Sequence, residues 1–470
     1  MSQTTKPLIC LVFILALASA LQAQPIDTLW TKTYWSGNYD SVGCVQETTD
    51  RGFIMTTLSV LPGHTDYDIS LIKTDSLGVM EWTKYIGDSH QEGGMHVLQT
   101  FDGGYLVSAR SSLTGGGDGG LWIVKTDAAG DTVWTFPYCP DNRGGYPLHA
   151  IELVDSSFAI TGMINRAATY NDAFILRLDK NGDFIDYDDY GDGNAQEARF
   201  IAQMADSGFL LAGSFRHTYT TENDWWVART NKFLDLLWDS SYVLTSQYDE
   251  MNGACLTDDG LVMTGRAANV SHAMKVDLEG HTVWSKSVSV GSSEERYISV
   301  CPTGDGGVMI GGLANVVSYR RNFIFLRLDP NGDTLWNFKV GGDDDDHGRS
   351  VIQTYDGNFA LAGKSSSWFN GTCTWLVKIG VPECCEERVG DANGLGDYPD
   401  EISLGDIMMI VDAKYIAENC DKIACLEEAD VNQSGGGDPT CDDISLVDIM
   451  TLVDFMFITG PENAVLLNCL

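Results

Sequence analysis

The chain alternates short apolar runs with turns rich in glycine, aspartate and asparagine, and the pattern is clearest over residues 97–134. Apolar runs at 97–100, 105–109 and 121–126 are separated by a Phe-Asp-Gly-Gly turn and a variable loop. An Asp-Ala-Ala-Gly turn then leads into a fourth run that begins at 131. None of the runs has helical periodicity, and glycine supplies the positive φ that tight turns require. The pattern predicts four short antiparallel strands per unit.

This unit returns seven times along the chain. In each copy a basic residue closes the third apolar run, and in six copies an acidic or amide residue follows two positions later: Lys73/Asp75, Lys125/Asp127, Arg177/Asp179, Arg229/Asn231, Lys275/Asp277 and Arg327/Asp329. In the seventh copy Lys378 is followed by Gly380. The successive spacings between the basic residues are 52, 52, 52, 46, 52 and 51. A fixed period of this length is typical of a stacked or circular array.

Two other positions repeat with the same period. The first turn of each unit carries an aspartate, at Asp50, Asp102, Asp155, Asp206, Asp258, Asp305 and Asp356. The fourth run carries a tryptophan, at Trp82, Trp134, Trp238, Trp284 and Trp336. The third copy departs most from the pattern, because Asp186 replaces the tryptophan and Ser156-Ser157 replaces the Gly-Gly of the turn.

The last unit lacks a fourth strand, and the N-terminal part of the chain contains a matching one. Residues 27–34 include Trp30, which lies 52 residues before Trp82. A strand borrowed from the N-terminus would complete the seventh unit and would remove the exposed sheet edge of an open array. We therefore predict a mainly β fold, a seven-bladed β-propeller over residues 24–380 that is closed by the N-terminal strand.

The units also resemble a known repeat of secreted bacterial proteins. The shared pattern is W-x-K-x-Y, then Q-T-x-D-G-G-Y, then D-x-x-L-I-K-T-D-x-x-G. It is legible at residues 82–85, 99–105 and 68–75. The resemblance covers about residues 27–380, implies the propeller fold and export, and says almost nothing about activity.

The N-terminal segment indicates where the protein is located, and the net charge limits the classes of partner it can bind. Lys6, an apolar run over 8–18 and small residues up to Ala23 predict a signal peptide over residues 1–23. No later segment is apolar enough to span a membrane, so we expect a secreted or cell-surface protein. The net charge is −37, and residues 381–470 contain 20 acids and 3 bases, a net of −17. This acidity argues against nucleic acid and anionic membranes as partners, and it permits a cation ligand.

A second, shorter duplication follows a linker at 381–389. The segment 402–412 matches 444–454, and each copy has apolar residues at helical spacing, such as Ile449, Leu452, Val453 and Met456. Each follows an acidic start of the form Asp-x-Asn. A loop that opens in this way and closes on a carboxylate in the first turn of a helix is typical of an EF-hand, which supplies the oxygen ligands that calcium prefers. The alternative is that these aspartates only cap helices.

The duplicated loop and helix resemble the type I dockerin family over residues 390–462, with 463–470 as a tail. The resemblance implies a small α-helical EF-hand-like domain, calcium as the cofactor and a cohesin-like protein partner. The implied calcium ligands are Asp391, Asn393, Asp397, Glu401, Asp406, Asp430, Asn432, Asp438, Asp443 and Asp448. The fifth ligand stays open between Asp397 and Asp400 in one loop and between Asp438 and Asp442 in the other. Both loops are longer than the family pattern, and Leu404-Gly405 and Leu446-Val447 replace the hydroxyl pair that many dockerins use to recognise cohesins.

The cysteines are concentrated in the same region. Six of the twelve lie beyond residue 381, and in an exported protein such a cluster predicts disulfide bonds. Cys255 and Cys301 occupy similar places in adjacent repeats, and the sequence leaves open whether they are bonded.

Three features of the propeller region could carry chemistry. His96 and His149 occupy equivalent places in adjacent units, which fits either a metal pair or lining of a central channel. The acidic run at 341–347 fits either a cation-binding rim or a solvated loop. The Asp-x-Asn-Gly-Asp segments at 179–183 and 329–333 look like calcium loops, but every unit turns there, which favours plain turns.

Two functions are consistent with these features. The first is a non-catalytic exported protein whose propeller is an interaction surface, for example for a carbohydrate or cell-surface ligand, and whose C-terminal module docks to a protein partner. The second is a secreted polysaccharide-active enzyme, a glycoside hydrolase or lyase with its site in the propeller channel. A glycosidase of this kind requires two carboxylates roughly 5–10 Å apart. No nucleophile, zinc-protease or phosphate-loop motif is present.

Overall fold

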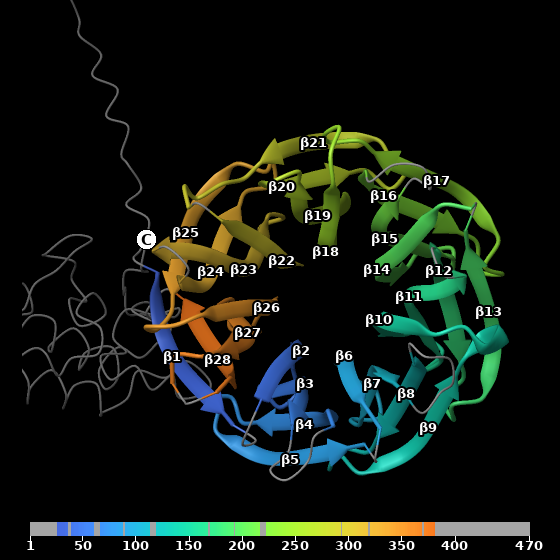
Figure 1. Ribbon diagram of the computed structural model, residues 1–470, viewed down its shortest axis with the longest axis horizontal. Helices are drawn as coiled ribbons and strands as arrows, with labels where there is room; N and C mark the ends of the chain where they lie inside the picture. Colours follow the sequence, from blue (N-terminus) through green and yellow to red (C-terminus); the bar gives the residue numbers. More distant parts are fainter. Residues whose placement is uncertain are drawn as a thin grey trace, which may run out of the picture. The chain divides into compact units, whose positions relative to one another are not determined.

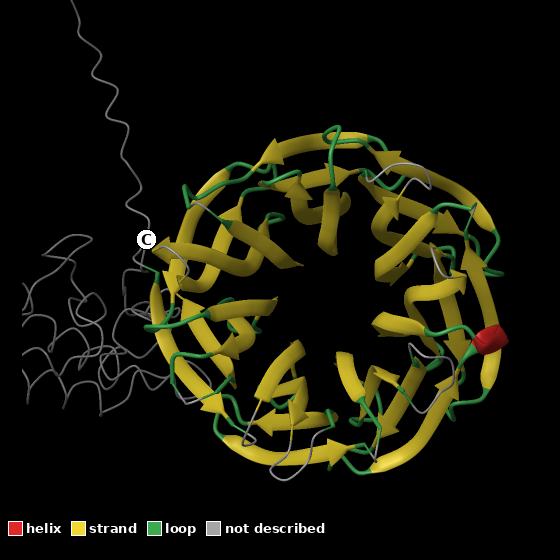
Figure 2. Ribbon diagram, in the orientation of Figure 1, coloured by secondary structure: helices red, strands yellow, loops and turns green. Residues whose placement is uncertain are grey.

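The computed structural model describes residues 26–35, 39–60, 66–87, 90–112, 119–167, 170–191, 193–216, 222–292, 294–317, 320–368 and 371–380. Within these ranges the chain forms 28 β-strands and one short 3-10 helix, η1 (Pro140–Asn142). The strands make seven four-stranded antiparallel sheets that follow one another around a ring (Figures 1 and 2). The predicted seven-bladed β-propeller is confirmed.

Each blade runs from a first strand near the axis of the ring to a fourth strand at its rim. The first four blades contain β2 (Tyr39–Glu47), β3 (Phe53–Val60), β4 (Asp68–Thr74) and β5 (Met80–Ile86); β6 (Glu92–Gln99), β7 (Tyr105–Ser111), β8 (Gly120–Thr126) and β9 (Thr132–Tyr138); β10 (Gly145–Glu152), β11 (Phe158–Ala167), β12 (Tyr170–Leu178) and β13 (Phe184–Tyr190); and β14 (Ala195–Gln203), β15 (Phe209–Arg216), β16 (Asn223–Thr230) and β17 (Leu236–Tyr242). The last three contain β18 (Asp249–Thr257), β19 (Gly260–Ala267), β20 (Val270–Val276) and β21 (Thr282–Ser287); β22 (Glu295–Pro302), β23 (Val308–Val317), β24 (Arg320–Leu328) and β25 (Thr334–Val340); and β26 (Asp346–Gln353), β27 (Phe359–Ser365), β28 (Cys373–Gly380) and β1 (Asp27–Tyr34).

The seventh blade is closed by the N-terminal strand, as predicted. Its strand order is β1-β28-β27-β26, so β1 takes the rim position that the chain leaves empty after Gly380 (Figure 1). The two ends of the propeller are therefore held in one sheet, and no blade in the described ring lacks its fourth strand.

The repeated basic residue is the buried member of an ion pair that we call the turn clamp. The Lys73 ammonium lies 2.9 Å from the Asp50 carboxylate and donates a hydrogen bond to the Thr74 carbonyl. The Lys125–Asp102 pair repeats this geometry at 3.0 Å. In both pairs the cation is buried and the carboxylate is exposed. The clamp therefore ties the third strand to the first turn of its own blade.

In the fifth blade the aspartate of the repeated turn is not the one that the sequence repeat indicates. Lys275 pairs with Asp259 at 2.5 Å, and not with Asp258. The reason is local: Asp259, two residues after Thr257, accepts a hydrogen bond from the Thr257 hydroxyl. Asp50 and Asp102 stand in the same relation to Thr48 and Thr100.

A second repeated contact joins neighbouring blades. The rim tryptophan of one blade lies against the turn glycine of the next: a Cβ placed on Gly78 would lie 2.8 Å from Trp30, and one on Gly130 would lie 2.8 Å from Trp82. These glycines have positive φ, so both the backbone and the neighbouring indole require the absence of a side chain. The tryptophan also packs edge-on against an aromatic ring of the next blade, as Trp30 does against Phe53 at 5.6 Å.

The third blade replaces this contact by a different one. Asp186 stands where the tryptophan is expected, and the facing turn of the fourth blade has Leu234 in place of glycine. Leu234 has a positive φ of 68° and is 1% exposed, within the core shared by the third and fourth blades. The larger side chain on one blade thus compensates for the smaller one on its neighbour.

Candidate functional site

The described propeller contains two hollows of interest, and the first is the central channel. Every first strand has a β-bulge at the same place, at Gly43, Met95, Leu148, Arg199, Asn252, Ile298 and Arg349. These residues and their neighbours from all seven blades line a cavity of about 570 Å³. The repeat therefore presents one irregular position per blade to the channel.

The channel has no acidic lining among the residues that the structure describes. Its charged residues are Arg199 and Arg349, and the two histidines also line it. The Arg199 guanidinium lies 2.8 Å from the Glu197 carboxylate, and Glu197 is not part of the lining. The carboxylate pair that a glycosidase requires is thus not found at this cavity.

His96 and His149 do meet in the channel. Their ring centroids are 4.3 Å apart, and His149 accepts a long hydrogen bond, 3.4 Å, from the Ile201 backbone N–H. Burial lowers the pKa of His96 to about 4 and that of His149 well below its usual value, so both rings are neutral at pH 7. Across the described residues no group of three or more His, Cys, Asp or Glu side chains is arranged to hold a metal ion. The pair lines the channel, and no third ligand joins it in the described residues.

Cys255 and Cys301 also line the channel. Both are buried free thiols in this structure and are not bonded to each other. Burial raises the pKa of Cys301 to about 12, and burial together with Cys301 raises that of Cys255, so neither is a reactive thiolate at neutral pH.

The acidic run at 341–347 is tied into local structure. The buried Asp346 carboxylate accepts hydrogen bonds from Ser365, Ser367 and the Gly342 N–H. Arg321 lies 3.8 Å from Asp345, and Arg320 lies 3.8 Å from Asp343. Because most of these carboxylates have protein partners, the run does not form a cluster dedicated to a cation.

The calcium-like segments at 179–183 and 329–333 are turns. The Asp179 carboxylate accepts hydrogen bonds from the backbone N–H groups of Asn181 and Asp183, both at 2.8 Å. Asp75, Asp127 and Asp277 accept the same two backbone bonds in their blades. The predicted turns are present in the geometry of the backbone.

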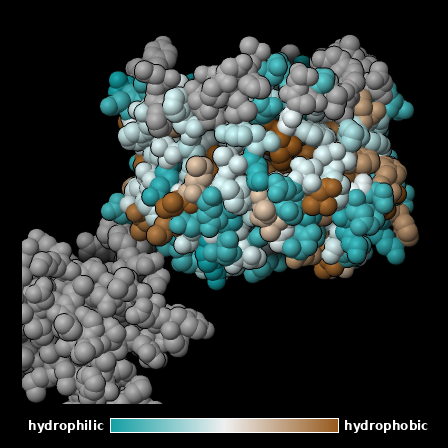
Figure 3. All heavy atoms as spheres, turned by 90° about the horizontal axis from the view of Figure 1, so that it is seen from below, coloured by the Kyte–Doolittle hydropathy of each residue, from teal (hydrophilic) through white to brown (hydrophobic). Residues whose placement is uncertain are grey.

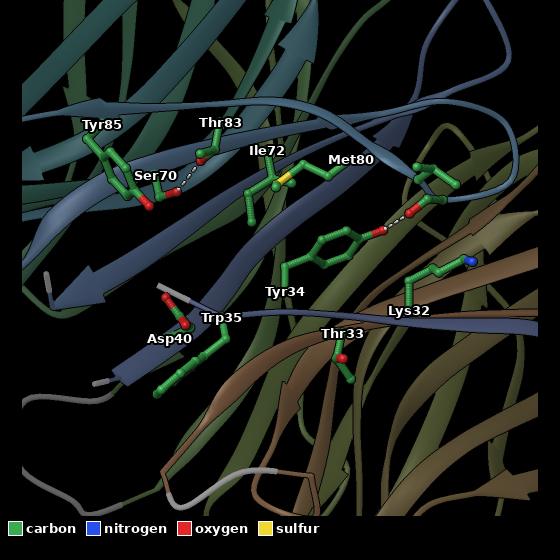
Figure 4. A pocket seen from close by; sticks show the side chains of 12 residues that line it. Lys32, Thr33, Tyr34, Trp35, Asp40, Ser70, Ile72, Met80, Thr83 and Tyr85 are labelled. Carbon is green, nitrogen blue, oxygen red and sulfur yellow. Dashed lines mark hydrogen bonds between the residues drawn. The ribbon is translucent and has the colours of Figure 1, made fainter. Parts of the chain in front are cut away.

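The second hollow lies where the ring closes, between β1 of the seventh blade and the outer strands of the first. We call it the closure pocket (Figure 4); its volume is about 410 Å³. The side chains that define its character are Tyr34, Trp35, Asp40, Ser70, Thr83 and Tyr85. Two aromatic rings stand at its edge, because Trp35 is 51% and Tyr85 is 46% exposed.

The closure pocket exists because the repeat fails at one position of the third strand. The residue three places before the basic one faces the preceding blade, and in six blades it is large: Trp122, Phe174, Trp226, His272, Ile324 and Trp375. Trp375, for example, packs against Phe323 of the sixth blade with ring centroids 4.6 Å apart. In the first blade the residue is Ser70, whose small side chain leaves the space open.

The rim of the pocket departs from the repeat as well. The position five places after the rim tryptophan, or after Asp186 in the third blade, is Gly87, Cys139, Gly191, Val243, Ser289 and Gly341 in the other blades. The corresponding residue after Trp30 of the closing strand is Trp35. A small residue inside and a large aromatic residue outside thus occur at the same junction. Sequence reasoning missed both, although aligning the seven copies at these two positions would have revealed them.

The polar groups of the closure pocket are mostly hydroxyls. The Ser70 and Thr83 hydroxyls lie 3.3 Å apart (Figure 4). Asp40 accepts a 2.6 Å hydrogen bond from Ser59. The Tyr34 hydroxyl donates to the Gly78 carbonyl at 2.7 Å. Burial, followed by the charge of Asp75, raises the pKa of Tyr34, so it remains a neutral donor. Nothing in this set is a nucleophile activated by a neighbouring base.

The outer wall offers separate apolar residues and no continuous patch on the face shown. Val133, Leu237, Val283 and Leu335 are each more than half exposed on the rim strands of different blades. In the edge-on view the hydrophobic side chains of the described part lie in separate spots among hydrophilic ones (Figure 3). Isolated exposed apolar residues of this kind are ordinary on protein surfaces.

The predicted calcium ligands lie outside the residues that the structure describes. This holds for Asp391, Asn393, Asp397, Glu401, Asp406, Asp430, Asn432, Asp438, Asp443 and Asp448, for the cysteines beyond 381 and for the predicted signal peptide at 1–23. Among the described residues, no helix is long and apolar enough to cross a membrane.

No protein-family model and no curated protein matches the sequence. The structure is similar to that of a streptogramin B lyase, with a TM-score of 0.48 and 11% identity over 75% of this chain and 97% of that one. It is also similar to a protein of unknown function from Dyadobacter fermentans, with a TM-score of 0.44 and 8% identity over 75% and 98%. A puromycin hydrolase gives 0.47 and 13% over 70% and 50%. At these identities and scores the matches carry no argument about function.

Proposed function

We propose that this is an exported, non-catalytic binding protein. In this proposal the propeller is the interaction surface, and the C-terminal module is a calcium-dependent, dockerin-like domain that docks to a cohesin-like protein partner. The support for binding over catalysis is the way the propeller uses its charges: the repeated acids and bases form turn clamps and backbone turns, and the described lining of the channel has no carboxylate.

The closure pocket adds a positive argument for binding. It is a concave surface in the size range of small-molecule sites, roughly 300–1,000 Å³, and it combines aromatic walls with a few polar groups. Its side chains offer contacts and hydrogen bonds, and they include no activated nucleophile. A surface of this kind can hold a ligand without transforming it.

The calcium part of the proposal is tested with the full mature chain. We expect isothermal titration calorimetry to show calcium binding that is lost in an Asp391→Ala/Asp430→Ala double variant, since each substitution removes the first ligand of a loop. An Asp179→Ala/Asp329→Ala variant is the matched control, because those residues form turns of the propeller. If the wild-type chain bound no calcium, the docking module as proposed would be wrong. Turnover of a polysaccharide by the mature chain would contradict the non-catalytic role.

A further inference from the structure

We propose that the closure pocket binds a neutral saccharide, which stacks on Trp35 and Tyr85 and is held by the hydroxyl groups inside. This inference rests on the proposed function, in that it names a ligand class for the propeller surface. The location is the first argument. Seven copies of one unit form this ring, and two substitutions coincide at the junction of the seventh and first blades. Ser70 stands there in place of a large buried residue, and Trp35 stands in place of a smaller residue at the rim.

The shape and exposure of the aromatic side chains are the second argument. Trp35 and Tyr85 are about half exposed, on opposite sides of the hollow in Figure 4, with Ser70 and Asp40 between them. The face of an aromatic ring has a partial negative charge, which attracts the weakly positive C–H groups of a sugar ring. Large aromatic rings left half in water at the edge of a cavity are suited to cover an apolar face of this kind.

The hydrogen-bonding groups are the third argument. Ser70 and Thr83 use one hydrogen bond between them, and a hydroxyl group can donate one bond and accept two. The pair therefore keeps capacity for the hydroxyls of a ligand, and Thr33 adds another hydroxyl to the same lining. A saccharide has the matching arrangement, with C–H groups on its faces and hydroxyls at its edge.

The charge of the lining selects a neutral ligand. Among the described residues that line the pocket, one is an acid, Asp40, and one is a base, Lys32. The lining has no surplus of positive charge for an anion such as a phosphate. An aromatic cage for a quaternary ammonium group would be expected to have a surplus of negative charge, and Lys32 opposes that. A neutral, amphipathic polyol fits both the charge and the hydroxyl groups.

The test measures oligosaccharide binding to the full mature chain by isothermal titration calorimetry. The probes are cellohexaose, xylohexaose, mannohexaose and chitohexaose, with choline as the cationic comparison. We expect at least one hexasaccharide to bind, and Trp35→Ala to weaken its affinity about tenfold or more. Ser70→Trp, which places in the first blade the residue that Trp375 provides in the seventh, should abolish binding by filling the pocket.

Matched controls separate the pocket from other exposed aromatic residues. Phe101→Ala removes a ring that is 70% exposed on a turn of the second blade, and it should leave the affinity unchanged. If Ser70→Trp does not fold, the Trp35→Ala and Tyr85→Ala variants still decide the matter, because both residues are exposed at the pocket edge.

Three results would overturn the inference. They are that no hexasaccharide binds, that the Trp35→Ala and Ser70→Trp variants bind as strongly as the wild-type chain, or that choline alone binds. The first two leave the propeller free to bind another ligand elsewhere, so the proposed function survives them. Chromatography of the same incubations detects any cleaved sugar. Cleavage would contradict the non-catalytic function, whereas the location of saccharide binding would still be decided by the variants.

Discussion

The junction between the third and fourth blades and the junction between the seventh and first blades both depart from the repeat, but only the first departure is compensated. Asp186 replaces a rim tryptophan, and Leu234 on the neighbouring turn fills the space, so the core there remains closed. Ser70 replaces a large residue that faces the preceding blade in the other copies, and no described residue fills the space, so the closure pocket remains. A substitution that a neighbouring residue compensates preserves the packing of the fold. A substitution that leaves a cavity beside exposed aromatic rings is a candidate for a functional site.

This comparison changes the significance of the third blade. The sequence indicates it as the most divergent copy and therefore as the place to look for a site. In the structure Ser156 adopts the positive φ expected of glycine, and the Asp155 carboxylate accepts hydrogen bonds from the Ser157 N–H and hydroxyl. The substitutions in this blade are thus accommodated within the turn or across the junction.

The largest expected effect comes from opening a second hollow where the ring is filled. Trp375→Ser copies the Ser70 exception into the seventh blade and removes a side chain that is 1% exposed. We expect a loss of about 3–5 kcal/mol in the free energy of unfolding, because a buried aromatic residue is replaced by a cavity and a buried hydroxyl. Urea denaturation of the mature chain measures it. A loss below about 1 kcal/mol would mean that the filled junctions are not what stabilises the ring.

The compensated junction can be tested by restoring the repeat. Leu234→Gly alone should cost about 2 kcal/mol, because the cavity outweighs the relief of the positive φ. Asp186→Trp alone should also destabilise the ring, since the indole would overlap Leu234. The double variant Asp186→Trp/Leu234→Gly recreates the contact seen between Trp82 and Gly130, so we expect it to recover most of the loss. Additive losses in this double-mutant cycle would contradict compensation.

The turn clamp should contribute less, in a pH-dependent way. Burial by itself would raise the pKa of Asp102, but hydrogen bonds from Thr100, Lys125 and Gly104 and the charge of Lys125 lower it below 3.8. A carboxyl whose pKa is lowered on folding stabilises the protein above the unfolded value, and this contribution disappears as the pH falls through the folded value. Asp102→Asn should therefore cost about 1 kcal/mol at pH 7, a figure reduced for solvent screening of the exposed carboxylate.

The same variant provides its own control at low pH. As the pH falls through the lowered pKa of Asp102, the wild-type carboxylate becomes protonated, so the difference in stability between wild type and Asp102→Asn should shrink and then vanish. Denaturant midpoints at about pH 7 and at successively lower pH measure this. A difference that is independent of pH would show that the amide disturbs the turn and not the ion pair.

The smallest expected effect is at the rim of the closure pocket. Trp35→Ala should change the free energy of unfolding by about 0.5 kcal/mol at most, because the side chain is half exposed. Trp35→Ala and Trp375→Ser both remove a tryptophan, and the same urea titration compares their free energies of unfolding. A large loss of stability for Trp35→Ala would mean that this tryptophan maintains the closure of the ring, which would weaken the case for a ligand.

Much of the architecture can be predicted from local pattern. Strand length, turn chemistry and the 52-residue spacing predict the blades, and the position of Trp30 predicts the closing strand, since these features depend on short-range sequence repeated many times. The aspartate of the repeated turn in the fifth blade is assigned one residue too early from the sequence, because two adjacent aspartates fit the turn motif and only the Thr257 hydrogen bond to Asp259 distinguishes them.

The sequence by itself determined the seven blades and their closure, because each copy confirms the others. The ion pairs of the turn clamps became visible only in the tertiary structure. Only the tertiary structure decided which exceptions to the repeat matter. Whether a space is filled depends on side chains from two blades at once, as with Asp186 and Leu234, and one copy cannot show what its neighbour supplies. The closure pocket is such a case: Ser70 and Trp35 are 35 residues apart in sequence and meet only because the ring brings β1 against the first blade.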